Sequence, residues 1–210
     1  MNITTLRPYA IERLEPLAGV FVRFGVTPNQ ISLLSLFFGI LCAFLFSLQE
    51  FLAGSIMLFI AGILDLVDGT VARKMDRESE FGAVFDWIVD KYVDSFALLG
   101  IGISGMASIS LILPLGATAD AGVAAIAIIG SMMNTFIKPV VYAEVGYSDR
   151  IQGKINDPLE GVGFFGRPET LVVLVLGGVA GLMWIAVLVV ALCTNLSAIQ
   201  RIIYLYRQLS

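Results

Sequence analysis

The chain has 210 residues, of which 58% are hydrophobic and 14% are charged, and its mean hydropathy is +0.89. This balance excludes an ordinary soluble domain and indicates a membrane protein. The net charge of −4 argues against nucleic acid as a partner, and the absence of histidine excludes Ser-His and Cys-His nucleophile schemes.

The first segment, residues 1–24, carries charged residues throughout and has no uninterrupted apolar core, so it does not resemble a signal peptide. Its apolar residues recur at roughly helical spacing. We therefore expect an amphipathic helix that lies in the membrane interface.

A helix-start signal follows, with Thr27 as the N-cap and Pro28 at the first helical position. Each membrane crossing needs roughly 20 apolar residues. We predict six crossings, at about 29–48, 51–74, 81–106, 119–143, 167–181 and 183–207. The last two are separated at Gly177, Gly178 and Gly181, because one helix over residues 168–203 would be roughly 50 Å long. The predicted fold class is an all-α integral membrane protein that forms one domain, 1–210.

The basic residues are distributed unevenly between the two ends of the predicted helices. Ten of the 13 lie before the first crossing, between the second and third, between the fourth and fifth, and at the C-terminus, whereas the loops near 49–50, 107–118 and 182 contain none. By the positive-inside rule, we expect a multi-pass protein of the cell membrane with both termini facing the cytoplasm.

Four aspartates lie on two consecutive predicted membrane helices. The segment reads Asp65-x-x-Asp68-Gly69-x-x-Ala72-Arg73, then eight residues, then Gly82-x-x-x-Asp86-x-x-x-Asp90. Spacings of three and four residues turn each pair of aspartates onto one face of its helix. In an antiparallel hairpin, Asp65 and Asp90 both lie roughly 12 Å from the cytoplasmic end, and Asp68 and Asp86 form a second layer.

Carboxylates buried together require cations between them. One central aspartate costs at least about 2.5 kcal/mol on insertion scales, and four would also repel one another. A single such aspartate could be protonated or paired with an arginine, but four at matching depth favour a metal site. An all-oxygen site without His or Cys suits Mg²⁺ or Mn²⁺, and the ligand count suits two ions. Asp94 lies one turn beyond Asp90, with Lys91 as a candidate charge partner.

On these residues the segment resembles the CDP-alcohol phosphotransferases, also called CDP-alcohol phosphatidyltransferases, whose signature is matched at every fixed position. The resemblance extends over nearly the whole chain, because that family also has six helices preceded by an interfacial helix. It implies an enzyme of phospholipid biosynthesis that transfers a substituted phosphoryl group from a CDP-linked lipid to an alcohol and releases CMP.

The family pattern also implies a role for each motif residue. Two divalent ions, Mg²⁺ or Mn²⁺, are held by Asp65, Asp68, Asp86 and Asp90, and Asp90 is also the base that takes the acceptor's proton. The residues implied to line the CDP site are Asp68, Gly69, Ala72, Arg73 and Gly82.

Three basic residues near the predicted cytoplasmic helix ends, Lys138, Arg167 and Arg201, are candidates for binding an acceptor phosphate. Cations at membrane depth are rare and usually functional, although snorkelling from a helix end is the alternative for Arg167 and Arg201.

The stretches 136–138, 166–169 and 198–201 resemble those of the branch of the family that makes phosphatidyl- or archaetidylinositol phosphate. In that branch such residues bind the phosphate of inositol 1-phosphate. The chain has Val140 and Thr170 where that branch has further basic residues.

Several alternatives stay open at this point. The acceptor could be glycerol 3-phosphate, serine or another alcohol, and the lipid could be CDP-diacylglycerol or CDP-archaeol. A cation or proton transporter could also place acidic residues at depth, although its site would lie nearer the midplane. The resemblance implies a homodimer, and glycine-rich helix faces permit close packing.

Overall fold

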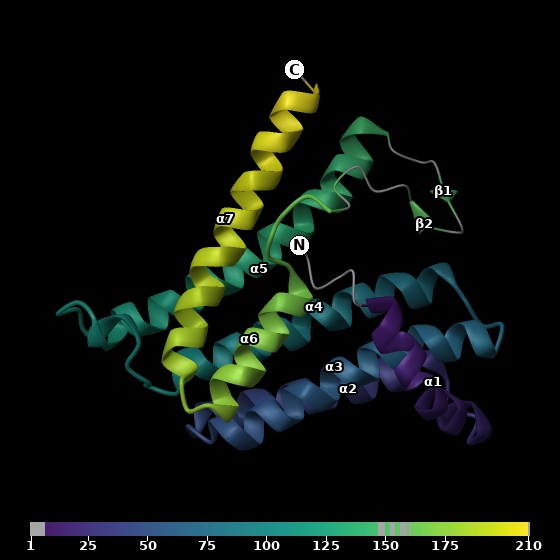
Figure 1. Ribbon diagram of the computed structural model, residues 1–210, viewed down its shortest axis with the longest axis horizontal. Helices are drawn as coiled ribbons and strands as arrows, with labels where there is room; N and C mark the ends of the chain where they lie inside the picture. Colours follow the sequence, from purple (N-terminus) through teal and green to yellow (C-terminus); the bar gives the residue numbers. More distant parts are fainter. Residues whose placement is uncertain (1–6, 147–149, 152–153, 156–158, 160, 210) are drawn as a thin grey trace.

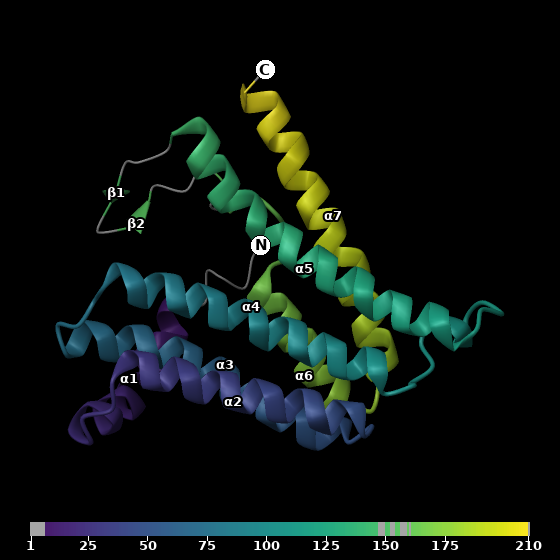
Figure 2. The same ribbon diagram turned by 180° about the vertical axis from the view of Figure 1, so that it is seen from behind.

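The computed structural model describes residues 7–146, 150–151, 154–155, 159 and 161–209. Its regular structure is helical apart from one short hairpin (Figures 1 and 2). The α-helices are α1 (Arg7–Arg23), α2 (Pro28–Ser47), α3 (Phe51–Lys74), α4 (Glu80–Ile103), α5 (Ala117–Val145), α6 (Arg167–Val179) and α7 (Met183–Leu209). The smaller elements are the 3-10 turn η2 (Ile109–Leu111) and the antiparallel strands β1 (Arg150–Ile151) and β2 (Lys154–Ile155).

The helix ends agree with the sequence signals to within a few residues. Thr27 is the N-cap of α2, Pro28 is its first residue, and the Thr27 N–H donates to Gln30 Oε1 at 2.9 Å. Two expected helices end early because a glycine follows in the left-handed region. Gly105 has φ +71° after α4, and Gly181 has φ +70° after α6. Of the expected interfacial segment, residues 7–23 are helical, and residues 1–6 lie outside the described part of the chain.

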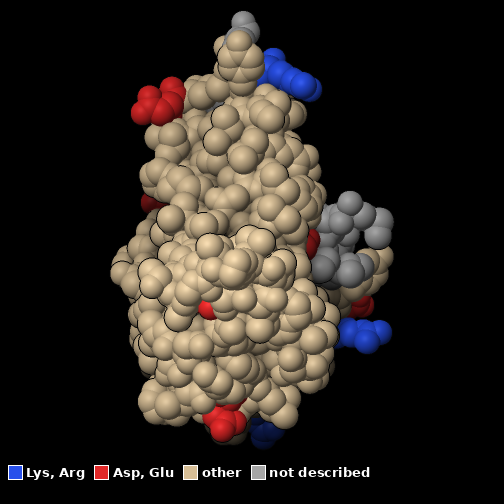
Figure 3. Space-filling model, turned by 90° about the vertical axis from the view of Figure 1, so that its left-hand side faces the viewer, with Lys and Arg blue, Asp and Glu red and all other residues tan. Residues whose placement is uncertain are grey.

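Four of the described helices, α2, α3, α5 and α7, are long and apolar enough to cross a membrane. The other two predicted crossings lack this character, for different reasons. The helix α4 carries five charged residues, Glu80, Asp86, Asp90, Lys91 and Asp94, and α6 has only 13 residues. Figure 3 shows a face made almost entirely of uncharged residues, with charged ones mostly near its edges. These features are those of a multi-pass membrane protein.

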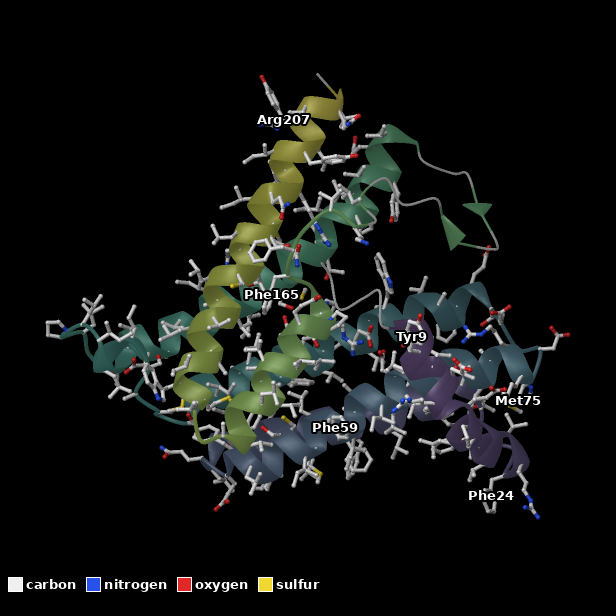
Figure 4. The ribbon with its side chains drawn as sticks, viewed as in Figure 1. Tyr9, Phe24, Phe59, Met75, Phe165 and Arg207 are labelled. Atoms are coloured by element: carbon white, nitrogen blue, oxygen red, sulfur yellow. The ribbon has the colours of Figure 1, made fainter. Side chains whose placement is uncertain are left out.

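The helix α2 lies between α3 and α4 and packs against both, whereas α3 and α4 touch each other little. The packing of α2 on α4 is very close at Gly100, where an added Cβ would lie 2.4 Å from the Ala43 carbonyl oxygen. The helix α6 packs on α3, and α5 packs along α7. Phe165 lies just before α6 starts, between these two groups of helices (Figure 4). The helices α3 and α4 therefore have few direct contacts, and α6 starts between them with Arg167.

The helix α1 is held against α3 by apolar packing and one ion pair. Ala18 of α1 is fully buried beside Ile31, Val67 and other residues of α2 and α3. Lys74 Nζ lies 2.8 Å from Glu15 Oε1, and this hydrogen bond and charge lower the pKa of Glu15 below its ordinary value. In contrast, Tyr9 of α1 and Phe24 just after it are exposed, at 69% and 78% (Figure 4).

A second polar feature lies in the connection between α4 and α5. Asp120, in the first turn of α5, accepts four hydrogen bonds. They come from the backbone N–H and the hydroxyl of Ser108 and from the same two groups of Ser110, at distances of 2.6 to 3.1 Å. This single carboxylate therefore fixes the turn η2 against the start of α5.

Candidate active site

Three of the motif aspartates converge between α3 and α4. Asp65 comes from α3, and Asp86 and Asp90 are one turn apart on the same face of α4. One carboxylate oxygen from each lies within 4.8 Å of the other two, and all three side chains are only partly exposed. Because α2 lies between α3 and α4 and these two have few direct contacts, the three carboxylates can meet between them.

Asp68 adjoins this group from the next turn of α3. It is 4% exposed, accepts a 2.6 Å hydrogen bond from Ser32 Oγ of α2, and interacts with Asp86 across the space between the helices. The sequence did not single out Ser32. No local pattern could have found it, because the hydrogen bond joins residues 36 apart in sequence.

Arg167, at the first position of α6, is the residue expected to bind the acceptor phosphate from this helix. Its guanidinium lies among the aspartates, where the sequence did not place it. Nη1 lies 2.6 Å from Asp65, Nη2 lies 2.8 Å from Asp90, and Nε lies 3.4 Å from Asp94. Lys91 pairs with Asp94 at 3.0 Å, as its spacing suggested. The acidic centre therefore includes a positive charge, that of Arg167. This residue follows Asp94 by 73 residues and Asp65 by 102 residues in sequence.

The residues expected at the CDP site lie toward the ends of α3 and α4 that face the connection between them. Gly69 leaves open space, because an added Cβ would meet only Arg73 Nη1, at 3.7 Å. An added Cβ on Gly82 would lie 3.5 Å from Asn29 Oδ1, so the start of α2 borders the same region. Arg73 is exposed and donates to Thr70 Oγ1 at 3.1 Å, and Ala72 beside it is half-buried.

The other two basic residues expected to bind the acceptor lie in α5 and α7. Arg201 is 7% exposed, and its Nε donates to the Val162 carbonyl at 2.8 Å while Nη1 donates to the Asn134 carbonyl. Lys138 is half-buried, one helical turn beyond Asn134 on α5. Arg201 thus ties α7 to α5 and to the chain before α6, and it approaches the Lys138 face of α5.

The donor set of the acidic centre fits a hard divalent cation. All of its candidate ligands are carboxylate oxygens, and the chain contains no histidine. Such ligands suit Mg²⁺ or Mn²⁺. Three oxygens within 4.8 Å of one another also repel strongly unless cations lie between them.

Comparison with known proteins agrees with this geometry. The sequence model of the CDP-alcohol phosphatidyltransferase family matches residues 25–194. The chain belongs to this family. The match includes every motif aspartate and Arg167, and it leaves the transporter alternative without support.

Among curated relatives, an archaetidylinositol phosphate synthase of Pyrococcus horikoshii is 30% identical over 104 residues, which cover 50% of this chain and 55% of that protein. A phosphatidylinositol phosphate synthase of Streptomyces avermitilis is 35% identical over 42% of this chain and 36% of its own length. The chain thus spans about half or less of the length of these relatives.

Solved structures of Mycobacterium tuberculosis phosphatidylinositol phosphate synthase share the fold. The one with CDP-DAG bound has a TM-score of 0.70 at 23% identity and covers 90% of each chain. The one in complex with manganese and citrate has a TM-score of 0.71 at 22% identity and covers 91% of this chain and 88% of that one.

Proposed function

We propose that this protein transfers a substituted phosphoryl group from a CDP-linked lipid, CDP-diacylglycerol or CDP-archaeol, to a polar alcohol and releases CMP. The observation that carries the proposal is the convergence of Asp65, Asp86 and Asp90 between two membrane helices, with Asp68 beside them. Their oxygens form the one three-carboxylate group of this kind among the described residues. Membership of the family gives this centre its chemistry.

The proposed cofactors are two divalent ions, Mg²⁺ or Mn²⁺, held by Asp65, Asp68, Asp86 and Asp90. Bound there, they would neutralise the pyrophosphate and the charge that develops on the leaving CMP. The protein's own contribution is the fixed direction of the ligands. Ser32 orients one oxygen of Asp68, and the helical spacing of Asp86 and Asp90 points both toward Asp65.

Asp90 is the proposed general base. It takes the proton from the acceptor hydroxyl, whose oxygen forms a new bond to the lipid-linked phosphorus as the bond from that phosphorus to CMP breaks. Gly69, Ala72, Arg73 and Gly82 are proposed to line the CDP site. The open space at Gly69 lets a phosphate approach the backbone of α3.

The proposed acceptor is inositol 1-phosphate, because the chain is similar to phosphatidyl- and archaetidylinositol phosphate synthases. Lys138, Arg167 and Arg201 are its proposed phosphate ligands. A phosphate dianion in a partly dry site needs several charge-assisted donors. Arg167 already lies at the acidic centre, where the acceptor hydroxyl has to reach Asp90.

The proposed domain is the whole chain, residues 1–210, with six crossings by α2 to α7 and with α1 in the interface. Asp86 and Asp90 of α4 belong to the acidic centre, and α6 begins at that centre with Arg167. The distribution of basic residues supports cytoplasmic termini and a cytoplasmic active site. A homodimer is proposed from the family resemblance, and cross-linking in native membranes tests it.

The function is tested with purified protein, CDP-lipid and Mg²⁺ or Mn²⁺. The acceptors are inositol 1-phosphate, glycerol 3-phosphate, serine and free inositol, and both CMP and the lipid product are measured. We expect metal-dependent CMP release that is saturable with inositol 1-phosphate. Absence of CMP release with all acceptors contradicts the proposed chemistry, and turnover with serine or free inositol alone contradicts only the acceptor.

A further inference from the structure

Asp94 is a buried carboxylate outside the aspartate motif, one turn beyond Asp90 on α4. Its side chain is 1% exposed, and its two oxygens face two different cations. Oδ1 lies 3.4 Å from Arg167 Nε, and Oδ2 lies 3.0 Å from Lys91 Nζ. A buried carboxylate is tolerated only when it is paired, so this double pairing holds Asp94 in one orientation.

Arg167 divides its nitrogens between this residue and the motif. The terminal nitrogens Nη1 and Nη2 face Asp65 and Asp90, at 2.6 and 2.8 Å. Among the described residues, Nη2 forms an ion pair with Asp90 but has no hydrogen bond of regular geometry, although the atom is buried. Nε lies 3.4 Å from Asp94, which is outside the motif. One edge of the guanidinium is thus anchored outside the motif, and the other edge faces it.

We propose that Asp94 is the positioning residue of Arg167. It holds Nε while the two terminal nitrogens exchange the motif aspartates for the phosphate of the acceptor. This inference rests on the proposed function. Because the guanidinium is planar, fixing Nε sets the plane in which both terminal nitrogens donate. An arginine that is already held on one edge also loses less side-chain entropy when its ligand binds.

Lys91 completes the arrangement by balancing the charge of Asp94. Without it, a carboxylate next to Arg167 would weaken the attraction of the arginine for an anion. Lys91 lies 3.0 Å from Asp94, so its positive charge offsets the negative charge that Asp94 brings to Arg167. Asp94 can therefore position Arg167 without greatly weakening the attraction of Arg167 for phosphate.

A positioning role and a purely electrostatic role predict opposite results for Asp94→Asn. Removing a negative charge near an anion site should tighten phosphate binding if only charge matters. If Asp94 positions Arg167, the same change should raise the KM for inositol 1-phosphate. We expect an increase of about tenfold, because the amide oxygen still accepts from Nε but without the charge that strengthens this hydrogen bond, with the KM for CDP-lipid unchanged. Asp94→Ala, which leaves no acceptor for Nε, should raise the KM further.

The matched control is Asp120→Asn, which removes another nearly buried carboxylate from a different part of the fold. It should lower the melting temperature and leave the KM for inositol 1-phosphate unchanged. An unchanged or lowered acceptor KM in Asp94→Asn overturns the inference while the wild-type activity keeps the proposed function. An equal rise in both variants also overturns it, because general loosening then explains the effect.

A second readout does not depend on turnover. The losses of melting temperature in Asp94→Asn and Arg167→Gln should add to more than the loss in the double variant, since the two side chains share one interaction. If the losses of melting temperature are additive, the interaction between Asp94 and Arg167 is contradicted. If the wild type releases no CMP with any acceptor, the proposed function fails, and a non-additive cycle still supports Asp94 as the anchor of Arg167.

Discussion

The protein contains two clusters built on buried carboxylates, and they are satisfied in opposite ways. Asp120 receives four hydrogen bonds from two neighbouring serines, all within 12 residues in sequence. The acidic centre instead brings together aspartates that face one another and one arginine. A carboxylate surrounded by donors needs no cation, whereas carboxylates that face one another are stabilised by cations, of which Arg167 is one. The comparison distinguishes a carboxylate that local hydrogen bonds satisfy from the carboxylates that are proposed to bind metal.

The largest effect should come from neutralising the ligands at the acidic centre. Asp65→Asn, Asp68→Asn and Asp86→Asn should each abolish CMP release, because each removes a proposed metal ligand. A chelator should do the same to the wild type, and added Mg²⁺ or Mn²⁺ should restore activity. Full CMP release in chelator contradicts the metal mechanism and removes the distinction between the two clusters.

The next effect separates catalysis from binding at the same centre. Asp90→Asn should lower kcat by at least roughly 10²-fold, because it removes the proposed general base. Binding of CDP-lipid, measured by titration in detergent, should remain detectable. An active Asp90→Asn enzyme assigns the base to another carboxylate.

A smaller effect is expected at the basic residues on the acceptor side. Lys138→Ala should raise the KM for inositol 1-phosphate by about tenfold, which corresponds to about 1.4 kcal/mol. Arg201→Ala should do the same and also lower the melting temperature, because Arg201 binds carbonyls of the chain before α6 and of α5. Steady-state kinetics with each substrate varied tests both. An equal rise in the KM for CDP-lipid contradicts an acceptor-side role.

The Asp120 cluster should respond differently. Asp120→Asn should lower the melting temperature by a few degrees, because one amide cannot accept all four hydrogen bonds. Activity per folded molecule should remain that of the wild type. Loss of activity in the folded variant contradicts its classification as structural.

The smallest effect is expected at Glu15, the exposed carboxylate that pairs with Lys74. Its pKa is lowered in the fold, so this pair stabilises above the ordinary pKa of a glutamate and is lost as the pH falls through the lowered value. Glu15→Gln should leave the melting temperature at pH 7 nearly unchanged, because exposed ion pairs contribute little. A large loss would show that α1 depends on this pair more than on its apolar contacts.

The sequence predicted those features that depend on residues close in the chain. Helix positions followed from apolar runs and from the Thr27 and Pro28 start signal, and the aspartate pairs followed from spacings of three and four residues. The pairing of Arg167 with Asp65 joins residues 102 apart, so no local pattern reveals it. The four donors to Asp120 come from an irregular loop whose path depends on packing.

The short helix α6 has a consequence for the membrane itself. Its 13 residues extend about 20 Å, whereas the hydrocarbon layer is roughly 30 Å thick. If its Gly181 end lies at the far surface, Arg167 lies about 10 Å beneath the near one. In the proposed topology, the polar acceptor and the headgroup of the lipid substrate have to reach about that depth to meet the acidic centre. The lipid tails can stay in the bilayer while the headgroup reacts there.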